Sequence, residues 1–429
     1  MKKIFALLLA LCMVLSLAAC GAKTDAPAAA PTEEPAETKA TEAATEAPAA
    51  AEDITLTVWG PQEDQGEGGW LPTMCEKFNE AHPEWNITFQ YGVCGENDAA
   101  TKVGTDVTAA ADVFMFASDQ LGVLLQAQAL AEFGGANLEA IKANNSEAMV
   151  NTVTYTDGGV YGVPFSPNTW FMYYNKNTYT EEDVKSLETM LEKGKVAFNI
   201  GDSWYLASFY VAAGGTLFGD TGADAAAGIQ FGGENGYAAT NYLVDLVAHP
   251  NFINDKDNNV GLGLMAEGKC DAFFSGTWKA ADTMAALGDN YAAAQLPTIT
   301  INGEQKQLRS FAGSKDIGVN PNTKNMKAAT ALAVFLGSEE AQLAHYEMRK
   351  VAPCHPALAA NPTIAADAAV AAQTATVANT SIAQPSIPEM GNYWVPAGNM
   401  GSDLGNGTVT HDNAQEKTDA FQAAINGGL

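Results

Sequence analysis

The chain has 429 residues, a net charge of −28 at neutral pH and only two arginines, Arg309 and Arg349. A surface this acidic repels nucleic acid, anionic lipid and phosphorylated ligands. We therefore expect no nucleic-acid partner and favour a neutral or cationic ligand. A surface that is acidic merely for solubility would give the same charge.

The N-terminus carries a secretion signal. Lys2 and Lys3 precede an apolar run, and small residues lead into Cys20. This pattern closely matches a bacterial lipoprotein signal, so we predict a signal peptide at 1–19 and lipidation of Cys20. An ordinary secretory signal cut nearby is the alternative. The run is too short for a good transmembrane helix. We therefore expect the protein on the extracellular face of the cell membrane.

The next segment, 20–53, is predicted to be a disordered tether. From residue 22 it consists almost entirely of Ala, Pro, Thr, Glu and Asp. Such a composition cannot bury enough apolar surface to offset the entropy cost of ordering the chain. The remaining 376 residues are enough for two domains.

Strands and helices alternate through the first part of the body. Strict alternation predicts a strand over 54–59, with Ile54, Leu56 and Val58 on one face. Helices are expected over 71–82 and 98–110, and a third helix is expected to begin after 118 or 119 and end at 127. Strands are expected over 86–91 and 112–116. Ser118 or Asp119 is expected to cap the helix ending at 127. This rhythm favours parallel sheets flanked by helices, with ligands beyond the strand ends.

A second α/β series begins near Trp170. Its predicted strands cover 171–174, 196–200, 271–275, 292–296 and 311–319. Its predicted helices cover 181–193, 204–213, 235–248, 260–267, 324–336, 339–350 and 409–425. Because 385–407 is rich in Pro and Gly, we expect an irregular connection there.

Aromatic residues beside polar ones indicate a binding surface. Trp59, Trp204, Trp278 and Trp394 each follow a strand or open a helix near polar residues. Aromatic faces offer flat apolar platforms, which suit the C–H faces of a sugar ring, while carboxylates and amides suit its hydroxyls. Burial of these side chains in the core is the alternative. The pattern favours a neutral oligosaccharide as ligand.

Several segments, taken in order, make the body resemble an extracellular solute-binding protein of an ABC sugar importer, of the maltose/maltodextrin-binding type. The segments are Asp112–Gly122, Leu130–Phe133, Tyr161–Pro164, Tyr174–Lys176, Phe198–Asn199, Ala212–Gly215, Leu296–Pro297, Ser386–Met390 and Trp394. The resemblance implies a two-lobed α/β fold, each lobe a mainly parallel sheet flanked by helices, joined by hinge crossovers. It implies an N-terminal lobe of 54–166 and 312–358 and a C-terminal lobe of 167–311 and 359–429. Membrane permease subunits are the implied partners, and we expect a monomer.

The resemblance also implies a set of sugar contacts. These are Trp59, Glu63, Asp64, Phe116, Asp119, Asn168, Asp202, Trp204, Trp278 and Trp394. Phe116 stands where the family has a stacking Trp, Gln120 replaces a basic residue, and Asn168 replaces a Glu. These departures leave the identity of the sugar open.

Catalysis and metal binding are not expected. The sequence lacks the usual hydrolase, metalloprotease and phosphate-loop motifs, and its histidines show no metal spacing. No cofactor is predicted. Asp255, Asp257 and Asn259 resemble the start of a calcium loop, but the later positions do not fit, which favours a solvated turn. A surface glycoside hydrolase and a non-transporting adhesin stay open as alternatives, as does a Cys75–Cys94 disulfide.

Overall fold

The computed structural model describes residues 51–220, 222–256 and 259–427. The predicted signal peptide, Cys20 and nearly all of the predicted tether therefore lie outside the described residues. The first strand, β1, begins at Glu52, so it starts two residues before the predicted strand. Among the described helices, none is both long and apolar enough to cross a membrane.

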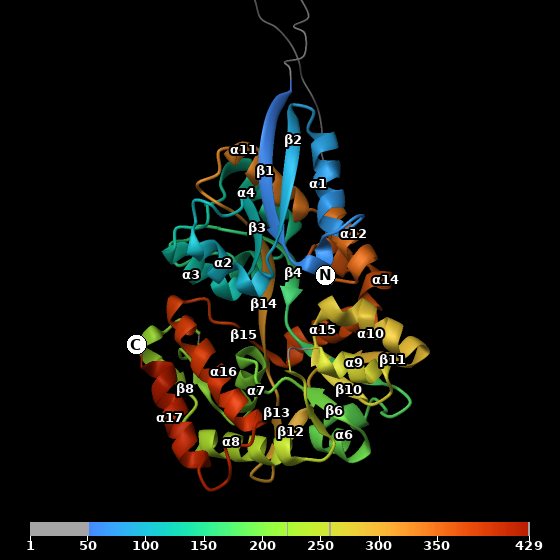
Figure 1. Ribbon diagram of the computed structural model, residues 1–429, viewed down its shortest axis with the longest axis vertical. Helices are drawn as coiled ribbons and strands as arrows, with labels where there is room; N and C mark the ends of the chain where they lie inside the picture. Colours follow the sequence, from blue (N-terminus) through green and yellow to red (C-terminus); the bar gives the residue numbers. More distant parts are fainter. Residues whose placement is uncertain (1–50, 221, 257–258, 428–429) are drawn as a thin grey trace, which may run out of the picture. The chain divides into compact units, whose positions relative to one another are not determined.

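A mixed sheet with the order β15-β14-β3-β1-β2, in which β4 also pairs with β14, forms the first lobe (Figure 1). Its β15 end extends to the second lobe, where Phe311 and Ile382 pack in the larger core of that lobe. Its strands are β1 (Glu52–Gly60), β2 (Trp85–Val93), β3 (Val113–Ala117), β4 (Val163–Asn168), β14 (Ser310–Val319) and β15 (Ser381–Ala383). β1 runs parallel to β2 and β3, whereas β14 runs antiparallel to β3 and β4. Ile54, Leu56 and Val58 are buried on one face of β1, as predicted.

The second lobe has a mixed sheet with the order β11-β5-β10-β6-β9. Its strands are β5 (Phe171–Asn175), β6 (Val196–Phe198), β9 (Phe252–Asn254), β10 (Ala272–Ser275) and β11 (Tyr291–Ala294). Alternate residues of β5 enter different cores: Met172 and Tyr174 pack on one face of the sheet, and Phe171 and Tyr173 on the other. Burial on both faces explains why this strand is apolar throughout.

Helices cover the sheets of both lobes (Figure 1). The first core takes residues from α1 (Trp70–Ala81), α2 (Ala99–Thr105), α3 (Leu121–Gln126), α4 (Gly135–Asn144), α5 (Glu147–Thr152), α11 (Met326–Leu336) and α12 (Glu339–Arg349). The larger core of the second lobe takes residues from α6 (Leu187–Lys193), α7 (Ser203–Ala212), α8 (Gly233–Ala248), α16 (Gly391–Gly405) and α17 (Ala414–Asn426). The smaller core takes residues from α9 (Val260–Ala266), α10 (Ala280–Leu287) and α15 (Ala368–Asn379). The two-lobed α/β fold is thus confirmed, with mixed rather than mainly parallel sheets.

The irregular connection predicted for 385–407 is wrong, because α16 occupies most of it. Two of its glycines, Gly401 and Gly405, serve close packing. A Cβ on Gly401 would lie 2.1 Å from the Ile200 carbonyl oxygen, so only glycine lets the helix approach that turn. Pro396 is tolerated inside the helix. The glycine content that predicted a loop here instead reflects the close contact of α16 with Ile200.

Two further local predictions are wrong. Neither Ser118 nor Asp119 caps α3, whose N-cap is Gln120 without a side-chain cap bond. Ser118 Oγ instead accepts a hydrogen bond from the backbone amide of Ser314 on β14. The helix predicted over 98–110 ends at Thr105, because the Asp106 carboxylate accepts from the amides of Thr108 and Ala109 and forms a turn.

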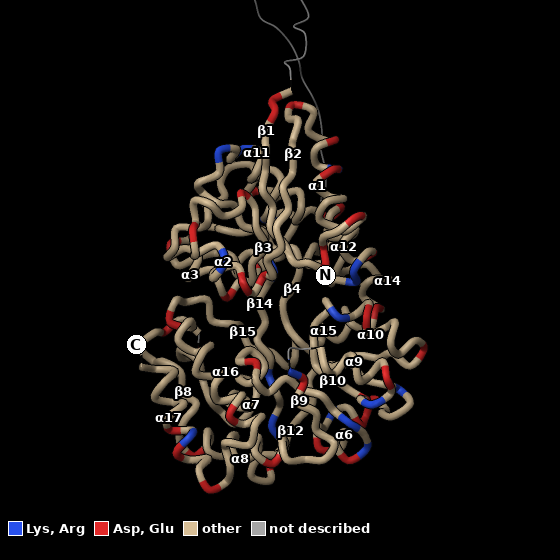
Figure 2. The backbone as a smooth tube through the Cα atoms, viewed as in Figure 1, with Lys and Arg blue, Asp and Glu red and all other residues tan. Residues whose placement is uncertain are grey.

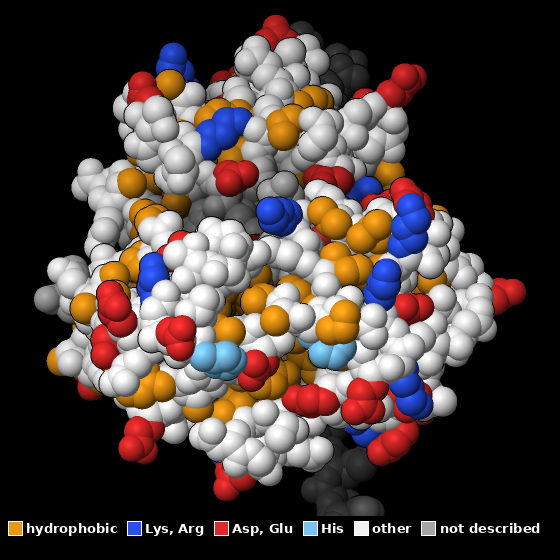
Figure 3. All heavy atoms as spheres, turned by 60° about the horizontal axis from the view of Figure 1, so that its bottom comes forward, with side chains coloured by type: hydrophobic (Ala, Val, Ile, Leu, Met, Phe, Trp, Pro, Cys, Tyr) orange, Lys and Arg blue, Asp and Glu red, His pale blue; other side chains and the backbone are white. Residues whose placement is uncertain are grey.

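Charge is spread over the surface. Acidic residues occur along most of the backbone trace in Figure 2, and on the face in Figure 3 they are scattered among cationic and apolar side chains. This distribution fits a solubilising surface better than one acidic docking patch. The four cysteines of the described part are buried free thiols, so Cys75 and Cys94 are not bonded to each other.

Candidate functional site

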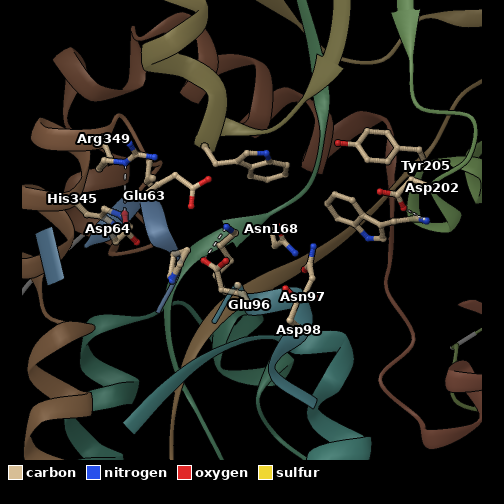
Figure 4. Close-up of a pocket in the computed structure, with 16 residues that line it drawn as sticks. Glu63, Asp64, Glu96, Asn97, Asp98, Asn168, Asp202, Tyr205, His345 and Arg349 are labelled. Atoms are coloured by element: carbon tan, nitrogen blue, oxygen red, sulfur yellow. Dashed lines mark hydrogen bonds and ion pairs between the residues drawn. The ribbon is translucent and has the colours of Figure 1, made fainter. Parts of the chain in front are cut away.

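A pocket of about 250 Å³ brings residues of both lobes together (Figure 4). It is lined by Pro61, Glu63, Asp64, Gly95, Glu96, Asn97, Asp98, Asn168, Asp202, Trp204, Tyr205, Trp278, Lys315, His345, Arg349 and Val351. Most of the charged side chains come from the first lobe. The three aromatic rings come from the second lobe. The pocket therefore has a polar wall and an aromatic wall.

Asp64 is the anchor of the polar wall. It follows β1 and is only 3% exposed. One carboxylate oxygen lies 3.0 Å from His345 Nε2 and 3.6 Å from Arg349 Nε, both on α12. Burial by itself would raise the pKa of Asp64, but His345, Lys315 and Arg349 together hold it below its ordinary value. A buried carboxylate held this way keeps the loop after β1 fixed on α12.

The loop after β2 completes the polar wall with Glu96, Asn97 and Asp98. Glu96 is buried and its carboxylate accepts from Lys315 Nζ at 3.0 Å. Both side chains are largely shielded, with 10% and 15% of their surface exposed. The same ammonium lies 4.9 Å from the centroid of the Trp278 ring. Lys315 thus links the polar wall to the aromatic wall.

Trp204 and Trp278 form the aromatic wall, together with Tyr205. The two indole rings lie 6.2 Å apart at an interplanar angle of 37°. Asp202 caps α7 by accepting from the backbone amide of Trp204, and Trp204 Nε1 donates to Gln384 Oε1. Trp278 packs so closely on Gly276 that a Cβ there would lie 1.9 Å from the ring. Both rings are therefore held in fixed orientations beside the pocket.

The structure brings six of the predicted contact residues to this pocket. They are Glu63, Asp64, Asn168, Asp202, Trp204 and Trp278. Glu63 is exposed, whereas Asn168 is buried at the end of β4. In Figure 4 the carboxylates of Glu63 and Asp64 lie on one side, and Asp202 and Tyr205 on the other.

The other four predicted contact residues do not line the pocket. The prediction of a stacking face at Phe116 is wrong: its ring is fully buried in the first core and packs against Phe114. Trp59 packs on Gly92, where a Cβ would lie 2.4 Å from the ring, and Lys102 Nζ lies 4.4 Å from its centroid.

Asp119 and Trp394 also lie outside the pocket lining. Asp119 is partly buried beside Asp316, and burial raises the pKa of its carboxyl to about 7. Trp394 is partly buried against Tyr393 and Phe311, with a centroid distance of 6.3 Å to the Phe311 ring. Trp394 thus packs against the larger core of the second lobe.

Sequence reasoning missed several lining residues. The loop Glu96–Asp98 follows β2, and the strand-end rule would have found it had β2 been extended to Val93. His345 and Arg349 lie four residues apart on α12 and so share one helix face, but the sequence does not reveal their partner. Lys315 carries no sequence signal, because its neighbours are set by pairing distant in the chain.

A metal site finds no support among the described residues, where no group of three or more His, Cys, Asp or Glu side chains is arranged to hold an ion. Of the possible calcium loop, Asp257 and Asn258 lie outside the described residues. Asp255 is buried and accepts from the backbone amide of Gly261.

Comparison with known proteins places this geometry in context. Residues 73–372 match the family model described as bacterial extracellular solute-binding protein. The galactooligosaccharide-binding protein of Bacillus subtilis (strain 168) is 28% identical over 329 residues, which cover 73% of this chain and 75% of that protein. A maltooligosaccharide ABC transporter solute-binding lipoprotein of Streptococcus pneumoniae (strain ATCC BAA-255 / R6) is 26% identical over 275 residues, 60% of this chain and 64% of that protein.

Solved structures with a similar fold point to the same family as the sequence relatives do. A solved structure determined with acarbose is 49% identical, superimposes with a TM-score of 0.84, and covers 87% of this chain and 99% of that one. The relatives from Bacillus subtilis and Streptococcus pneumoniae are binding proteins by name. This agrees with a pocket that has one aromatic wall and one hydrogen-bonding wall. Since the family model matches well over half of its length, this chain belongs to the bacterial extracellular solute-binding protein family.

Proposed function

We propose that this protein is the lipid-anchored substrate-binding component of an ABC importer, and that it captures a neutral oligosaccharide of the maltodextrin type between its lobes. The observation that carries the proposal is the pair of fixed indole rings, Trp204 and Trp278, facing a wall of carboxylates and amides. A sugar ring would stack its C–H face on an indole and donate its hydroxyls to Glu63, Asn168 or Asp202.

The relatives support the ligand class. Their names specify a galactooligosaccharide and a maltooligosaccharide, and the solved structure 49% identical to this chain was determined with acarbose, itself an oligosaccharide analogue. The charge of −28 also favours a neutral or cationic ligand.

Lobe closure supplies the mechanism. An open form admits the sugar, and contacts from both walls are complete only when the lobes approach, so ligand shifts the equilibrium toward the closed form. The closed form then docks on permease subunits as a monomer. We assign 54–166 and 312–358 to the N-terminal lobe and 167–311 and 359–429 to the C-terminal lobe.

Calorimetry tests the ligand class. The full-length protein is titrated with malto-, xylo-, manno- and fructo-oligosaccharides, and we expect tight binding within the malto series. Failure to bind any glycan would overturn the proposal. Tight binding of another series alone would retain a sugar receptor and reject the maltodextrin assignment.

The same samples test the hydrolase alternative, since the pocket holds several carboxylates and a glycosidase needs two flanking the scissile bond. We expect no release of reducing ends during long incubation with the bound sugar. Steady release that stops in an Asp202→Asn variant would instead identify a glycoside hydrolase.

Anchoring is tested in cells. One lipidated residue at Cys20 would hold the receptor at high effective concentration near its permease. Cys20→Ala should therefore reduce sugar uptake and release the protein into the medium, while calorimetry of the released protein shows unchanged affinity. Full uptake by a protein found only in the medium would contradict the role of the anchor.

A further inference from the structure

Gln384 is not among the residues that line the pocket, but it holds one of the rings that do. Trp204 Nε1 donates a hydrogen bond to Gln384 Oε1 at 3.0 Å. Because an indole N–H can only donate, the amide oxygen must face the ring. The amide nitrogen, Nε2, is buried and has no hydrogen-bond partner within the described part of the chain. The side chain is therefore oriented by its contact with Trp204.

The backbone of Gln384 is attached to β14. Gln384 directly follows β15, which pairs in parallel with the first residues of β14, and its backbone amide donates to the Ala312 carbonyl at 3.0 Å. A Cβ on Gly313, the next residue of β14, would lie 2.5 Å from Ser118 Oγ and 3.9 Å from Gln384 Oε1. The strand thus approaches both side chains closely at a residue that has no side chain of its own.

The same strand carries Lys315 into the pocket. Lys315 lies three residues after Ala312, and its ammonium lies 4.9 Å from the centroid of the Trp278 ring. The Trp278 ring in turn lies 6.2 Å from the Trp204 ring. These contacts form a closed circuit, which runs from Gln384 to Trp204, Trp278 and Lys315, along β14 to Ala312, and back to Gln384.

The circuit orders the Trp204 ring before any ligand arrives. The cap by Asp202 holds the backbone of Trp204, whereas the hydrogen bond to Gln384 acts on the indole itself. Trp204 is only half-buried, so packing alone does not enclose the ring. A side chain that must be immobilised on binding reduces the affinity, and one that is already ordered does not.

We infer that Gln384 is a positioning residue for sugar binding. It fixes the orientation of the Trp204 ring relative to β14, and so it keeps the spacing between the aromatic wall and Lys315 of the polar wall. This inference rests on the proposed function, because the ring that Gln384 positions is one on which the sugar stacks. Gln384 itself needs no contact with the sugar, so its substitution acts through the ring.

Nuclear magnetic resonance tests the positioning without any sugar. In full-length protein labelled with the heavy nitrogen isotope, Trp204→Phe removes one indole N–H signal and thereby identifies it. Gln384→Met keeps the length of the side chain but removes the acceptor. It should shift the Trp204 signal and speed the exchange of its proton with water. An unchanged signal would overturn the proposal.

Calorimetry with maltotriose tests the effect on binding. Gln384→Met should weaken the affinity by about twofold to tenfold, the cost of ordering one side chain on binding. In a Trp204→Phe background, where the ring has no N–H, the same substitution should cause no further loss. Equal losses in both backgrounds would contradict an action through the indole. Gln384→Glu retains an acceptor oxygen and should bind more tightly than Gln384→Met.

Gln422 provides the matched control. It is also a half-buried glutamine of the second lobe, where its Oε1 accepts from the Phe231 amide at 2.6 Å and its Nε2 donates to the Ile229 carbonyl at 2.7 Å. Gln422→Met should lower the thermal stability but leave the Trp204 signal and the affinity unchanged. A similar loss of affinity in both methionine variants would show a general effect of stability and reject the role of Gln384.

The outcomes separate this inference from the proposed function. If the wild-type protein does not bind maltotriose while the Trp204 signal responds to Gln384→Met, the positioning of the ring is supported and the maltodextrin assignment fails. If maltotriose binds and the signal does not respond, Gln384 does not position the ring, and the proposed function stands without it.

Discussion

The two walls of the pocket hold their side chains in different ways. The polar wall, from the first lobe, depends on buried charges: Asp64 with His345 and Arg349, and Glu96 with Lys315. The aromatic wall, from the second lobe, depends on packing of Trp204 and Trp278 against a helix cap and a glycine.

The difference separates two requirements of a sugar receptor. Buried charges are costly unless paired, so the polar wall is sensitive to loss of any one partner. Indole rings contribute through area and shape, so the aromatic wall should govern affinity more than stability. Substitutions in each wall can test this division.

The largest effect is expected at Asp64. Asp64→Ala leaves His345 and Arg349 without their carboxylate, which should lower the free energy of unfolding by about 3–5 kcal/mol. Urea denaturation measures this. Glu340→Ala, on the helix that carries His345 and Arg349 but in an exposed pair with Lys77, should leave the free energy of unfolding nearly unchanged. Similar losses at both positions would contradict the special role of the buried charges.

The Asp64 contribution should also depend on pH. Its pKa is lower in the folded state than in the unfolded chain, so the unfolded chain binds more protons in acid. The stabilisation is therefore fully present above about pH 4 and is lost as the pH falls through the folded pKa. Wild type and Asp64→Ala should converge in stability below that pH.

The next largest effect is expected at Trp278. Trp278→Ala removes one stacking face and should weaken oligosaccharide binding by about 1–3 kcal/mol. Calorimetry measures the affinity, and thermal unfolding should change much less than for Asp64→Ala. A variant that loses stability but keeps its affinity would place Trp278 in the core instead of the site.

Lys315 joins the two walls and should affect both properties. Lys315→Met keeps the aliphatic stem but removes the ion pair with Glu96 and the charge over Trp278. We expect a loss of about 1–2 kcal/mol in unfolding free energy and weaker sugar binding. Lys102→Met is the matched control, because Lys102 lies over Trp59, outside the pocket lining. Equal loss of affinity in both variants would contradict the linking role.

An effect that appears only on changing the pH is expected at Asp119. Burial raises its pKa to about 7, above the unfolded value of about 4, so the folded protein holds an extra proton between these pH values. Stability should therefore fall as the pH rises from about 4 to about 7. Asp119→Asn should flatten this slope, with a remainder from buried Asp316, whose pKa is also raised by burial. An unchanged slope would show that Asp119 is not the titrating group.

The smallest effect on binding is expected at Trp394. Its ring packs on Tyr393 and Phe311 outside the pocket lining, so Trp394→Ala should lower the thermal stability but change sugar affinity by no more than about 0.5 kcal/mol. A loss of affinity as large as that of Trp278→Ala would show that the lobes close onto Trp394.

The sequence predicted most strands, because alternation in β1 and the apolar runs of β3 and β5 follow directly from burial on one or both faces. It did not predict α16, because the glycines of this segment resemble a loop, although Gly401 and Gly405 pack against Ile200. It also could not tell Trp278, which faces the pocket, from Phe116, which is fully buried, because both lie at or just after the end of a strand and close to polar residues.

The sequence by itself determined the fold class, the alternation of elements and the chemical types available for a sugar site. Periodicity and composition are local properties, so they can be read from neighbouring residues. Only the tertiary structure decided which groups meet. The pairing of Asp64 with His345, and of Lys315 with Glu96, joins residues more than 200 positions apart, and so does the close approach of Gly401 on α16 to the carbonyl of Ile200 after β6.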